Sequence, residues 1–422
     1  MARATAVSEF LTGLFDRRWI GGPKLEAQPI EDLCRALLST SGQVSGRQIA
    51  SAILRRYGGL DATEKLAFFH FLNDALDLNA SEVADLAAAY GHDPSPKAFA
   101  ALSRAAEPQR QELFRRLNQA EGATAQLVRM RVDLLRLLKE HPALKRTDMD
   151  LTHLLRSWFN RGFLVLKQIS WDTPASILEK IVAYEAVHEI QDWDDLRRRL
   201  HPPDRRCFAF FHPAMPDEPL IFVEVALTEA VPGSIQAVLA EDRAPLEIEA
   251  ARTAVFYSIS NCQKGLAGIS FGNLLIKQVA SELAQALPQL TTFVTLSPIP
   301  GLRRWAEGEG ITPPPAPGDL AAHYLLNARR SDGLPVDPVA RFHLGNGAAV
   351  LEVHEAADAS PKGAAQSYGV MVNYHYDLSQ TERNHEDFAL NQTIAASKSI
   401  KAKARAAQTQ LPAPQRPGPT DS

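Results

Sequence analysis

The chain has 422 residues, and its 45 Lys and Arg against 49 Asp and Glu leave a formal net charge of −4. This length predicts two or three domains, and the near balance of charge disfavours a nucleic-acid binder. No apolar run reaches the roughly 18 residues of a membrane span. The cysteines, Cys34, Cys207 and Cys262, are too few for a disulfide framework or a CxxC-type zinc site.

Targeting signals are missing from both ends of the sequence. The first residues, MARATAVSEF, lack the charged and apolar regions of a secretory signal, and Glu9 disfavours a transit peptide. The last residues, PGPTDS, match no peroxisomal or retention signal. We therefore expect a cytoplasmic protein without a membrane partner.

Residues 1–165 have the apolar spacing of helices. The segment TAQLVRMRVDLLRLLKEH repeats apolar positions at Leu127, Met130, Leu134, Leu137 and Leu138, with arginines between them that make the polar side basic. Three further helices are expected at 31–40, at 63–76 with a cap at Thr63, and at 81–91 between Ser81 and Gly91. This pattern predicts a helical domain that serves packing or subunit contact.

Short runs of β-branched and aromatic residues follow residue 165 and predict strands. They are CFAFFH (207–212), LIFVEVALT (220–228), TAVFYSIS (253–260), TTFVTLS (291–297), ARFHLG (340–345) and AVLEVHE (349–355). The turn residues MPDEP join the first two into a hairpin. The third and fourth enclose the helix-length GNLLIKQVASELAQALP, which predicts a βαβ unit. Residues 396–422 combine basic residues with prolines and are expected to be disordered.

A glycine-bearing loop, QKGLAGISFG (263–272), precedes this helix. Gly265, Gly268 and Gly272 permit close backbone approach, and the helix N-terminus offers free N–H groups, which together suit a pyrophosphate. The loop is neither a Walker A loop nor a clean GxGxxG motif. It looks like the CoA-binding turn of GNAT-type acetyltransferases, and a plain connection is the alternative.

Four blocks in the second half carry a resemblance to a known family. They are AVFYSISNCQKGLAGISFGNLLIKQV, TFVTLSPIPGL, RFHLGNGA and NYHYDLSQTERNHEDF, with PDEPLIFVEVALT upstream. Their sequence and order resemble the malonyl-CoA decarboxylase family over most of residues 165–390. The combination of SPIPG with FHLGNGA is specific.

The resemblance implies an α+β protein of three parts: a helical domain (1–165), a GNAT-like catalytic domain (166–395) and the tail (396–422). It implies a carboxy-lyase of fatty acid metabolism that converts malonyl-CoA to acetyl-CoA and CO2. No metal or organic cofactor is expected, because the thioester carbonyl accepts the electron pair. Homo-oligomerisation through the helical domain is also implied.

Ser297 and His343 match the family's catalytic serine and histidine. The family's assignment makes Ser297 the proton acceptor and His343 the proton donor. In an alternative, His343 protonates the enolate carbon while Ser297 holds the departing carboxylate. Without the resemblance, a turn-capping serine and a core histidine on a strand are the simpler interpretations.

Further positions match the family's substrate site. Ser258 is expected near the substrate, and Tyr374, with Tyr376 beside it, offers a phenol to the thioester or carboxylate. The expected CoA-binding loop residues are Ala267, Gly268, Ile269, Ser270, Phe271, Gly272 and Asn273. Ser270 stands where some family members have glutamate, so an acid–base role for that glutamate does not transfer. His375 and His385, with their acidic neighbours, fit no standard metal-ligand spacing.

Two other functions compete with decarboxylation. An acyl-CoA-dependent N-acyltransferase would use the same CoA-binding unit, but it needs an acceptor-amine groove and a base. A catalytically inactive CoA-binding module is the third possibility, and the presence of Ser297 and His343 disfavours it.

Overall fold

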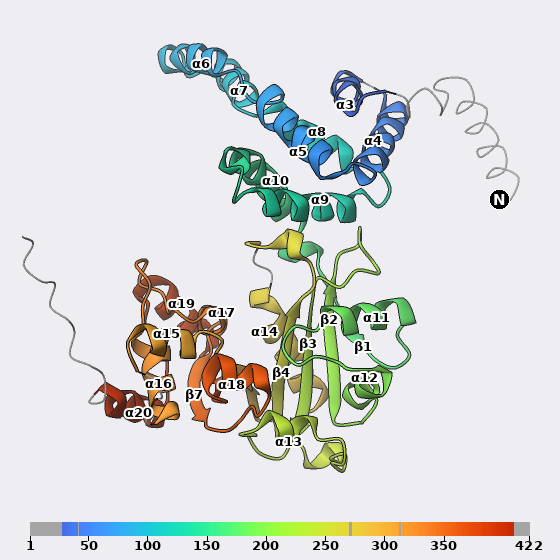
Figure 1. Ribbon diagram of the computed structural model, residues 1–422. Coiled ribbons are helices and arrows are strands. Elements are labelled where there is room, and N and C mark those ends of the chain that lie inside the picture. Colours follow the sequence, from blue (N-terminus) through green and yellow to red (C-terminus); the bar gives the residue numbers. More distant parts are fainter. Residues whose placement is uncertain (1–27, 41, 270–271, 312–313, 315, 409–422) are drawn as a thin grey trace, which may run out of the picture. The chain divides into compact units, whose positions relative to one another are not determined.

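The computed structural model of the protein describes residues 28–40, 42–269, 272–311, 314 and 316–408. The chain forms two compact units, shown as ribbons in Figure 1. The first contains the described residues up to Phe163, together with 213–215 and 263–269. The second contains the other described residues from Leu164 onward.

The first unit is mainly helical. Its helices are α3 (Ile30–Ser39), α4 (Gln43–Gly58), α5 (Ala62–His70), η1 (Phe71–Ala75), α6 (Ala80–His92), α7 (Pro96–Ala105), α8 (Gln109–Leu117), α9 (Ala123–Leu137), η2 (Pro142–Leu144), α10 (Lys145–Trp158) and η3 (Arg161–Phe163), and the 263–269 segment adds η5 (Lys264–Leu266). Here η1 is a π-helix and the other η elements are 3-10 helices.

The predicted helices of this unit are present, but two of them have an N-cap other than the one expected. Asp61, not Thr63, caps α5, where it forms a capping box with Glu64. Asn79, not Ser81, accepts the hydrogen bond that caps α6. Of the core positions predicted in α9, Leu127, Met130 and Leu134 are buried and Leu137 is half-buried. Arg131, on the predicted polar side, is also buried.

The second unit is built on a mixed sheet with helices, the expected α+β class. Its elements are β1 (Val165–Ile169), α11 (Ala175–Tyr184), α12 (Trp193–Leu200), β2 (Arg205–Phe211), β3 (Ile221–Thr228), α13 (Ile235–Leu239), η4 (Ile248–Ala250), β4 (Thr253–Asn261), α14 (Gly272–Ala286), β5 (Thr292–Thr295), β6 (Ser297–Pro298), α15 (Leu302–Gly308), α16 (Pro317–Asn327), α17 (Pro338–Gly345), β7 (Ala349–His354), α18 (Pro361–Ser367), β8 (Met371–His375), α19 (Thr381–Asn391) and α20 (Lys398–Gln408).

The strand order is β1-β2-β3-β4-β5-β8-β6, and β7 also pairs with β8. The predicted β2–β3 hairpin is present as an antiparallel pair. The predicted βαβ unit is also present, since α14 connects β4 to a parallel β5. The antiparallel run β1-β2-β3-β4 is thus followed by one parallel pair, and β5 then pairs with an antiparallel β8.

Two irregularities in the centre of the sheet create space for a site. Ser258 pairs with Glu224 and Phe256 with Val225, so Tyr257 is an extra, bulged residue of β4. The parallel pairing with β5 stops at Phe256 and Thr295. Beyond this point β4 continues to Asn261 beside β3, while the chain after β5 turns to pair with β8.

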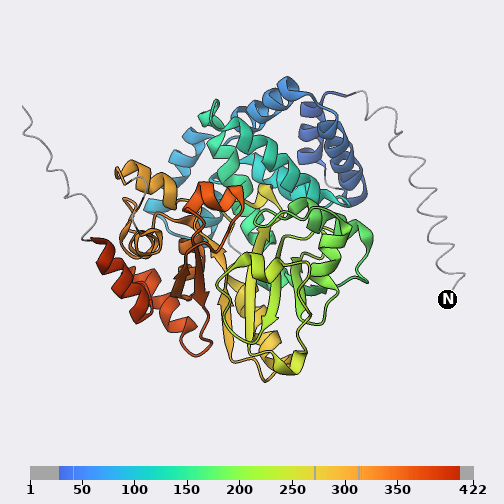
Figure 2. The same ribbon diagram turned by 60° about the horizontal axis from the view of Figure 1, so that its bottom comes forward.

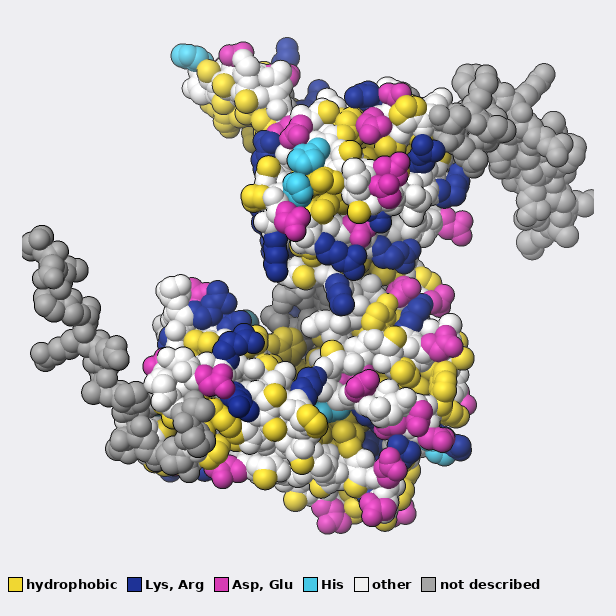
Figure 3. Space-filling model, in the orientation of Figure 1, with side chains coloured by type: hydrophobic (Ala, Val, Ile, Leu, Met, Phe, Trp, Pro, Cys, Tyr) yellow, Lys and Arg dark blue, Asp and Glu magenta, His cyan; other side chains and the backbone are white. Residues whose placement is uncertain are grey.

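Helices cover the sheet because its strands bury alternate side chains on opposite faces. Cys207, Ala209 and Phe211 of β2 form one apolar cluster with Ile181 of α11 and Leu196 of α12. Figure 1 shows these two helices beside β1 and β2. On the face of each unit visible in Figure 3, side chains of both charges are interspersed. No helix in the described part of the chain is long and apolar enough to cross a membrane.

The strand predicted at 340–345 is wrong, because this segment belongs to helix α17. Pro338 occupies the first turn, and the side chain of Asp337 accepts a hydrogen bond from the Ala340 backbone at 2.8 Å. An acidic cap followed by proline is a helix-start signal. The alternation of apolar residues in ARFHLG concealed it.

The disorder predicted from residue 396 is wrong for residues 398–408, which form helix α20. Ile400, Ala404 and Ala407 share one face and are buried. This helix packs against α16 and is dark red in Figures 1 and 2. Lys403 also reaches Glu352 of β7 at 2.7 Å. Small alanines hid the apolar face from a composition-based prediction, and 409–422 lie outside the described residues.

Docking of α20 predicts a stability effect. Replacing the buried Ile400 with alanine should lower the free energy of unfolding by about 2–5 kcal/mol, since it leaves a cavity against α16. The exposed neighbour Lys401 provides the control, and Lys401→Ala should stay within about 0.5 kcal/mol of the wild type. Urea unfolding measures both, and equal effects would contradict the docked helix.

Candidate active site

A cavity of about 240 Å³ lies where β4 and β5 diverge. Its lining residues are Val187, Phe256, Tyr257, Ile259, Asn261, Ser297, Pro298, Pro338, Val339, Phe342 and His343. The bulge at Tyr257 explains why two successive residues of β4, Phe256 and Tyr257, both reach the same cavity. None of the described lining residues is Asp, Glu, Lys or Arg, so the cavity is largely apolar.

Ser297 and His343 meet at the wall of this cavity. Ser297 Oγ lies 3.2 Å from His343 Nε2 and donates to Thr295 Oγ1 at 2.8 Å. Both residues are almost fully buried, with exposed fractions of 6% for Ser297 and 2% for His343. The structure thus brings together two side chains that are 46 residues apart in the sequence.

His343 is held on two further sides. Its Nδ1 lies 2.8 Å from the hydroxyl of Tyr376. Its ring stacks on Tyr374 with a centroid distance of 4.5 Å and an interplanar angle of 23°. Burial lowers the pKa of His343 to about 3, so the imidazole is neutral near pH 7.

The turn after α17 fixes the end of the helix that carries His343. The Asn346 side chain donates to the Phe342 carbonyl at 2.7 Å, and the Ala348 backbone nitrogen donates to the His343 carbonyl at 3.1 Å. Gly347 has a φ of +83°, and a side chain there would collide with the Thr381 backbone. Only glycine therefore fits this turn.

Tyr374 contributes its ring to the site. It is fully buried behind His343, and it is absent from the described residues that line the cavity. Its hydroxyl has no hydrogen-bond partner among the described residues. The hydroxyl that bonds the histidine belongs instead to Tyr376.

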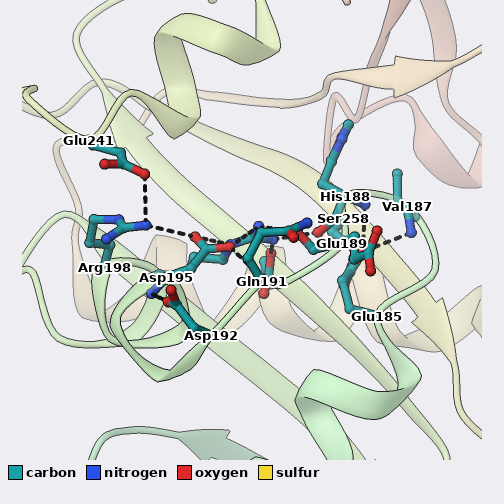
Figure 4. Close-up of polar contacts among 12 residues, drawn as sticks. Glu185, Val187, His188, Glu189, Gln191, Asp192, Asp195, Arg198, Glu241 and Ser258 are labelled. Carbon is teal, nitrogen blue, oxygen red and sulfur yellow. Dashed lines mark hydrogen bonds and ion pairs between the residues drawn. The ribbon is translucent and has the colours of Figure 1, made fainter. Parts of the chain in front are cut away.

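Ser258 points toward Glu185 (Figure 4) and is absent from the described residues that line the cavity. Its hydroxyl lies 2.7 Å from each carboxylate oxygen of Glu185. The same carboxylate accepts the backbone N–H groups of Val187 and His188 at 2.8 and 2.9 Å. Ser258 therefore acts on the cavity indirectly, through the segment that follows Glu185.

Side chains from elsewhere in the second unit bind the backbone carbonyls of residues 186–189 in this segment. Lys362 donates to the carbonyls of Ala186 and Val187 at 2.7 and 3.1 Å. Arg199 donates to the carbonyls of His188 and Glu189 at 2.8 and 3.1 Å. The result is a fixed wall that presents Val187 to the cavity.

The predicted CoA-binding loop lies partly in the described region. Ala267, Gly268 and Ile269 belong to the 263–269 segment of the first unit. Gly272 begins α14. Ser270 and Phe271, and the side chain of Asn273, lie outside the described residues.

Several residues that organise these sites had no local sequence signal. Thr295, Glu185 and Arg131 act through partners that are distant in the sequence or on another element. The three thiols are free and buried, and burial raises the pKa of Cys262. Among the described residues, no group of three or more His, Cys, Asp or Glu side chains is arranged to hold a metal ion.

The fold and the site define an α+β enzyme whose second unit carries a buried serine–histidine pair. Family models assign residues 77–159 to the malonyl-CoA decarboxylase N-terminal domain, and 162–313 and 315–413 to the malonyl-CoA decarboxylase C-terminal domain. The chain therefore belongs to the malonyl-CoA decarboxylase family, whose members are carboxy-lyases.

Individual relatives agree with this assignment. The chain is 36% identical to a mitochondrial malonyl-CoA decarboxylase of Anser anser anser over 348 residues, and this alignment covers 69% of each chain. It is 32% identical to that of Mus musculus, with 82% of each chain covered. The crystal structure of a Rhodopseudomonas palustris malonyl-CoA decarboxylase aligns with a TM-score of 0.83 and 47% identity, and covers 91% of this chain and 100% of that one. The Agrobacterium vitis structure aligns with a TM-score of 0.84 and 49% identity, and covers 89% and 99%.

The buried neutral His343 predicts a pH-dependent stability. A histidine in the unfolded chain has a pKa of about 6.5, whereas the folded value is about 3. Between these values the unfolded chain binds more protons, so this contribution is complete above pH 6.5 and is lost as the pH falls toward 3. The slope is up to about 1.4 kcal/mol per pH unit.

His343→Gln should therefore flatten the decline of the unfolding free energy between pH 6.5 and 4, as measured by urea unfolding. The exposed His92 gives the control substitution His92→Gln, which should keep the wild-type slope. An unchanged slope for His343→Gln would contradict a neutral buried imidazole.

The contact between Ser258 and Glu185 predicts the outcome of a second substitution. Ser258→Ala should lower the unfolding free energy by about 1.5–3 kcal/mol, since it removes a hydrogen bond to a charged group. Ser260→Ala removes one hydrogen bond to Glu185, of 3.2 Å, and should lower the unfolding free energy by a smaller amount. A direct substrate contact would give the opposite pattern, with a raised KM and unchanged stability.

Proposed function

We propose that this chain converts malonyl-CoA to acetyl-CoA and CO2, with Ser297 and His343 as the proton-transfer pair. The observation that carries the proposal is the Ser297–His343 hydrogen bond at the wall of an uncharged cavity. Membership of the malonyl-CoA decarboxylase family supports malonyl-CoA as the substrate. It also favours a lyase over the N-acyltransferase alternative.

The reaction begins when the bond between the carboxylate and the α-carbon breaks. Its electron pair passes into the thioester carbonyl, CO2 leaves, and a thioester enolate remains. The apolar side chains of Phe256, Ile259 and Val339 favour this step, because they solvate a localised carboxylate poorly. The enolate spreads the same charge over more atoms.

The open edge of β4 suits the enolate oxygen. Among the described strands, residues 257–261 are paired on the β3 side alone, since the pairing with β5 stops at Phe256. Backbone N–H groups at such an edge seek an acceptor, and fixed N–H donors are effective in stabilising an oxyanion. We assign the thioester to this edge of the cavity.

Hydrogen bonding around His343 favours one direction of proton transfer. The Ser297 hydroxyl donates to Thr295, which leaves its oxygen free to accept from His343 Nε2–H. The Tyr376 hydroxyl then donates to Nδ1. A thioester enolate is basic enough to draw a proton from this pair: the Ser297 hydroxyl proton passes to the α-carbon, the Nε2 proton of His343 replaces it, and Tyr376 protonates Nδ1. Because Tyr376 is buried, it regains its proton from Nδ1 when water that enters the vacated cavity returns a proton to Nε2.

We propose further that the reaction needs no metal or organic cofactor, because the thioester supplies the electron sink. Dialysis against EDTA should then leave the activity unchanged. The loop 263–269 is proposed to bind the CoA pyrophosphate. Homo-oligomerisation through the helical unit and a cytoplasmic location remain predictions from the sequence.

The proposal predicts that purified protein releases CO2 and acetyl-CoA from malonyl-CoA without an added amine. His343→Asn and Ser297→Ala should each lower kcat by about 10²- to 10⁴-fold, the usual contribution of a positioned acid or base. The His92→Asn control should retain full activity. Deuterium incorporation into acetyl-CoA in D2O reports the protonation step separately.

Absence of CO2 without an amine acceptor would overturn the proposed reaction. Full decarboxylation and full deuterium incorporation by His343→Asn would overturn the role of the histidine. Loss of deuterium incorporation with CO2 release retained would assign His343 to protonation alone.

A further inference from the structure

A buried arginine in the first unit holds the loop 263–269. Arg131 of α9 has an exposed fraction of 3%. Its Nη1 donates to the carbonyls of Gly265 and Ala267 at 2.7 and 2.9 Å, and its Nε donates to Asp148 at 2.8 Å. Building upon the proposed function, we infer that Arg131 is a positioning residue that orients this loop for the pyrophosphate of CoA.

The orientation of the loop's peptide groups carries the inference. An anion is bound by backbone N–H groups, so the carbonyls of an anion-binding loop must be turned away from it. Arg131 draws the Ala267 carbonyl toward α9. In a planar trans peptide the N–H lies opposite the carbonyl, so the N–H of Gly268 points away from Arg131. Gly268 is a predicted pyrophosphate-binding position.

The loop also fits against the backbone of α9. A Cβ at Gly265 would collide with the Val128 carbonyl, so only glycine permits this approach. The sequence suggested that Gly265 allows the backbone to approach a ligand, whereas in the structure it allows the approach of the loop to α9. Arg156 adds a bond from α10 to the Gly268 carbonyl at 3.3 Å.

Arg131 itself is held firmly. Lys145 donates to the other oxygen of Asp148 at 2.7 Å. Although burial alone acts in the opposite direction, the hydrogen bonds from Lys145 and Arg131 keep the pKa of Asp148 below its usual value. The carboxylate therefore stays ionised near pH 7 and anchors the guanidinium that orients the loop.

Two substrates separate positioning of the loop from general damage. Malonyl-CoA carries the pyrophosphate, and malonyl-pantetheine has the same thioester without it. Arg131→Gln should raise KM for malonyl-CoA by about 10- to 100-fold, the equivalent of losing charged hydrogen bonds. The kcat for malonyl-CoA and the KM for malonyl-pantetheine should both stay within about two-fold. The KM of Arg131→Lys for malonyl-CoA should lie between those of Arg131→Gln and the wild type. Lysine keeps the positive charge but lacks the several N–H donors of the guanidinium.

Arg110 supplies the matched control. It is equally buried, with an exposed fraction of 2%, and it bonds Asp150 and the Asn73 carbonyl within the same unit. Its described hydrogen bonds and ion pairs include none to residues 263–269. Arg110→Gln should lower the melting temperature as Arg131→Gln does, yet leave the ratio of the two KM values unchanged.

Calorimetric binding of CoA and of pantetheine to the full chain distinguishes the two proposals. If the wild type binds CoA but releases no CO2, the proposed function fails and the binding data still test Arg131. If the wild type decarboxylates and Arg131→Gln keeps the preference for CoA over pantetheine, the inference alone is overturned. Equal losses for both substrates, or the same change in Arg110→Gln, also overturn it. Should Arg131→Gln not fold, Arg131→Lys decides by the same ratio.

Discussion

The divergence of β4 from β5 is the constraint on which the site depends. Parallel pairing ends at Phe256 and Thr295, and everything chemically important in the second unit lies just beyond it. Beyond it, β4 has no strand partner on its β5 side among the described residues. The segment after β5 turns and places Ser297 against β8. A fully paired sheet would fill this space with backbone and leave no cavity.

Placement of His343 depends on the same divergence through a different element. Helix α17 begins with Pro338, and the turn after it requires glycine at position 347. These two constraints fix the position of the last helical turn, which carries His343. Tyr374 and Tyr376 approach it from β8 and the residue just after it, one through its ring and one through its hydroxyl. Both tyrosines reach the histidine because β8 pairs with the edge of β5 opposite to β4, at Val294 and His375, and continues beside Ser297.

Local patterns in the sequence were enough to predict the helical first part, the β2–β3 hairpin and the βαβ unit, whereas the α+β class and the pair Ser297 and His343 were predicted from the resemblance to the malonyl-CoA decarboxylase family. They failed at α17, where apolar alternation concealed an Asp–Pro helix start, and at α20, where alanines supply most of the buried face. Partners such as Glu185 and Ser258, or Arg131 and Gly265, are 73 and 134 residues apart. No periodicity links residues at such separations, so the orientation of Ser258 and the burial of Arg131 required three-dimensional structure.

The distribution of charge explains how one neutral pair can suffice for the chemistry. The reacting groups carry no charge near pH 7: Ser297 is a hydroxyl, burial lowers the pKa of His343, and burial raises that of Tyr376. The ionised groups stand one contact away and act on backbone, as Glu185 and Arg199 do on the segment that presents Val187. A fixed cation at the carboxylate would stabilise the substrate before CO2 leaves and so raise the barrier to decarboxylation. Here the charged side chains bind the backbone behind the cavity wall and, in the described part of the chain, do not line the cavity. They hold the wall in place without stabilising the carboxylate of the substrate.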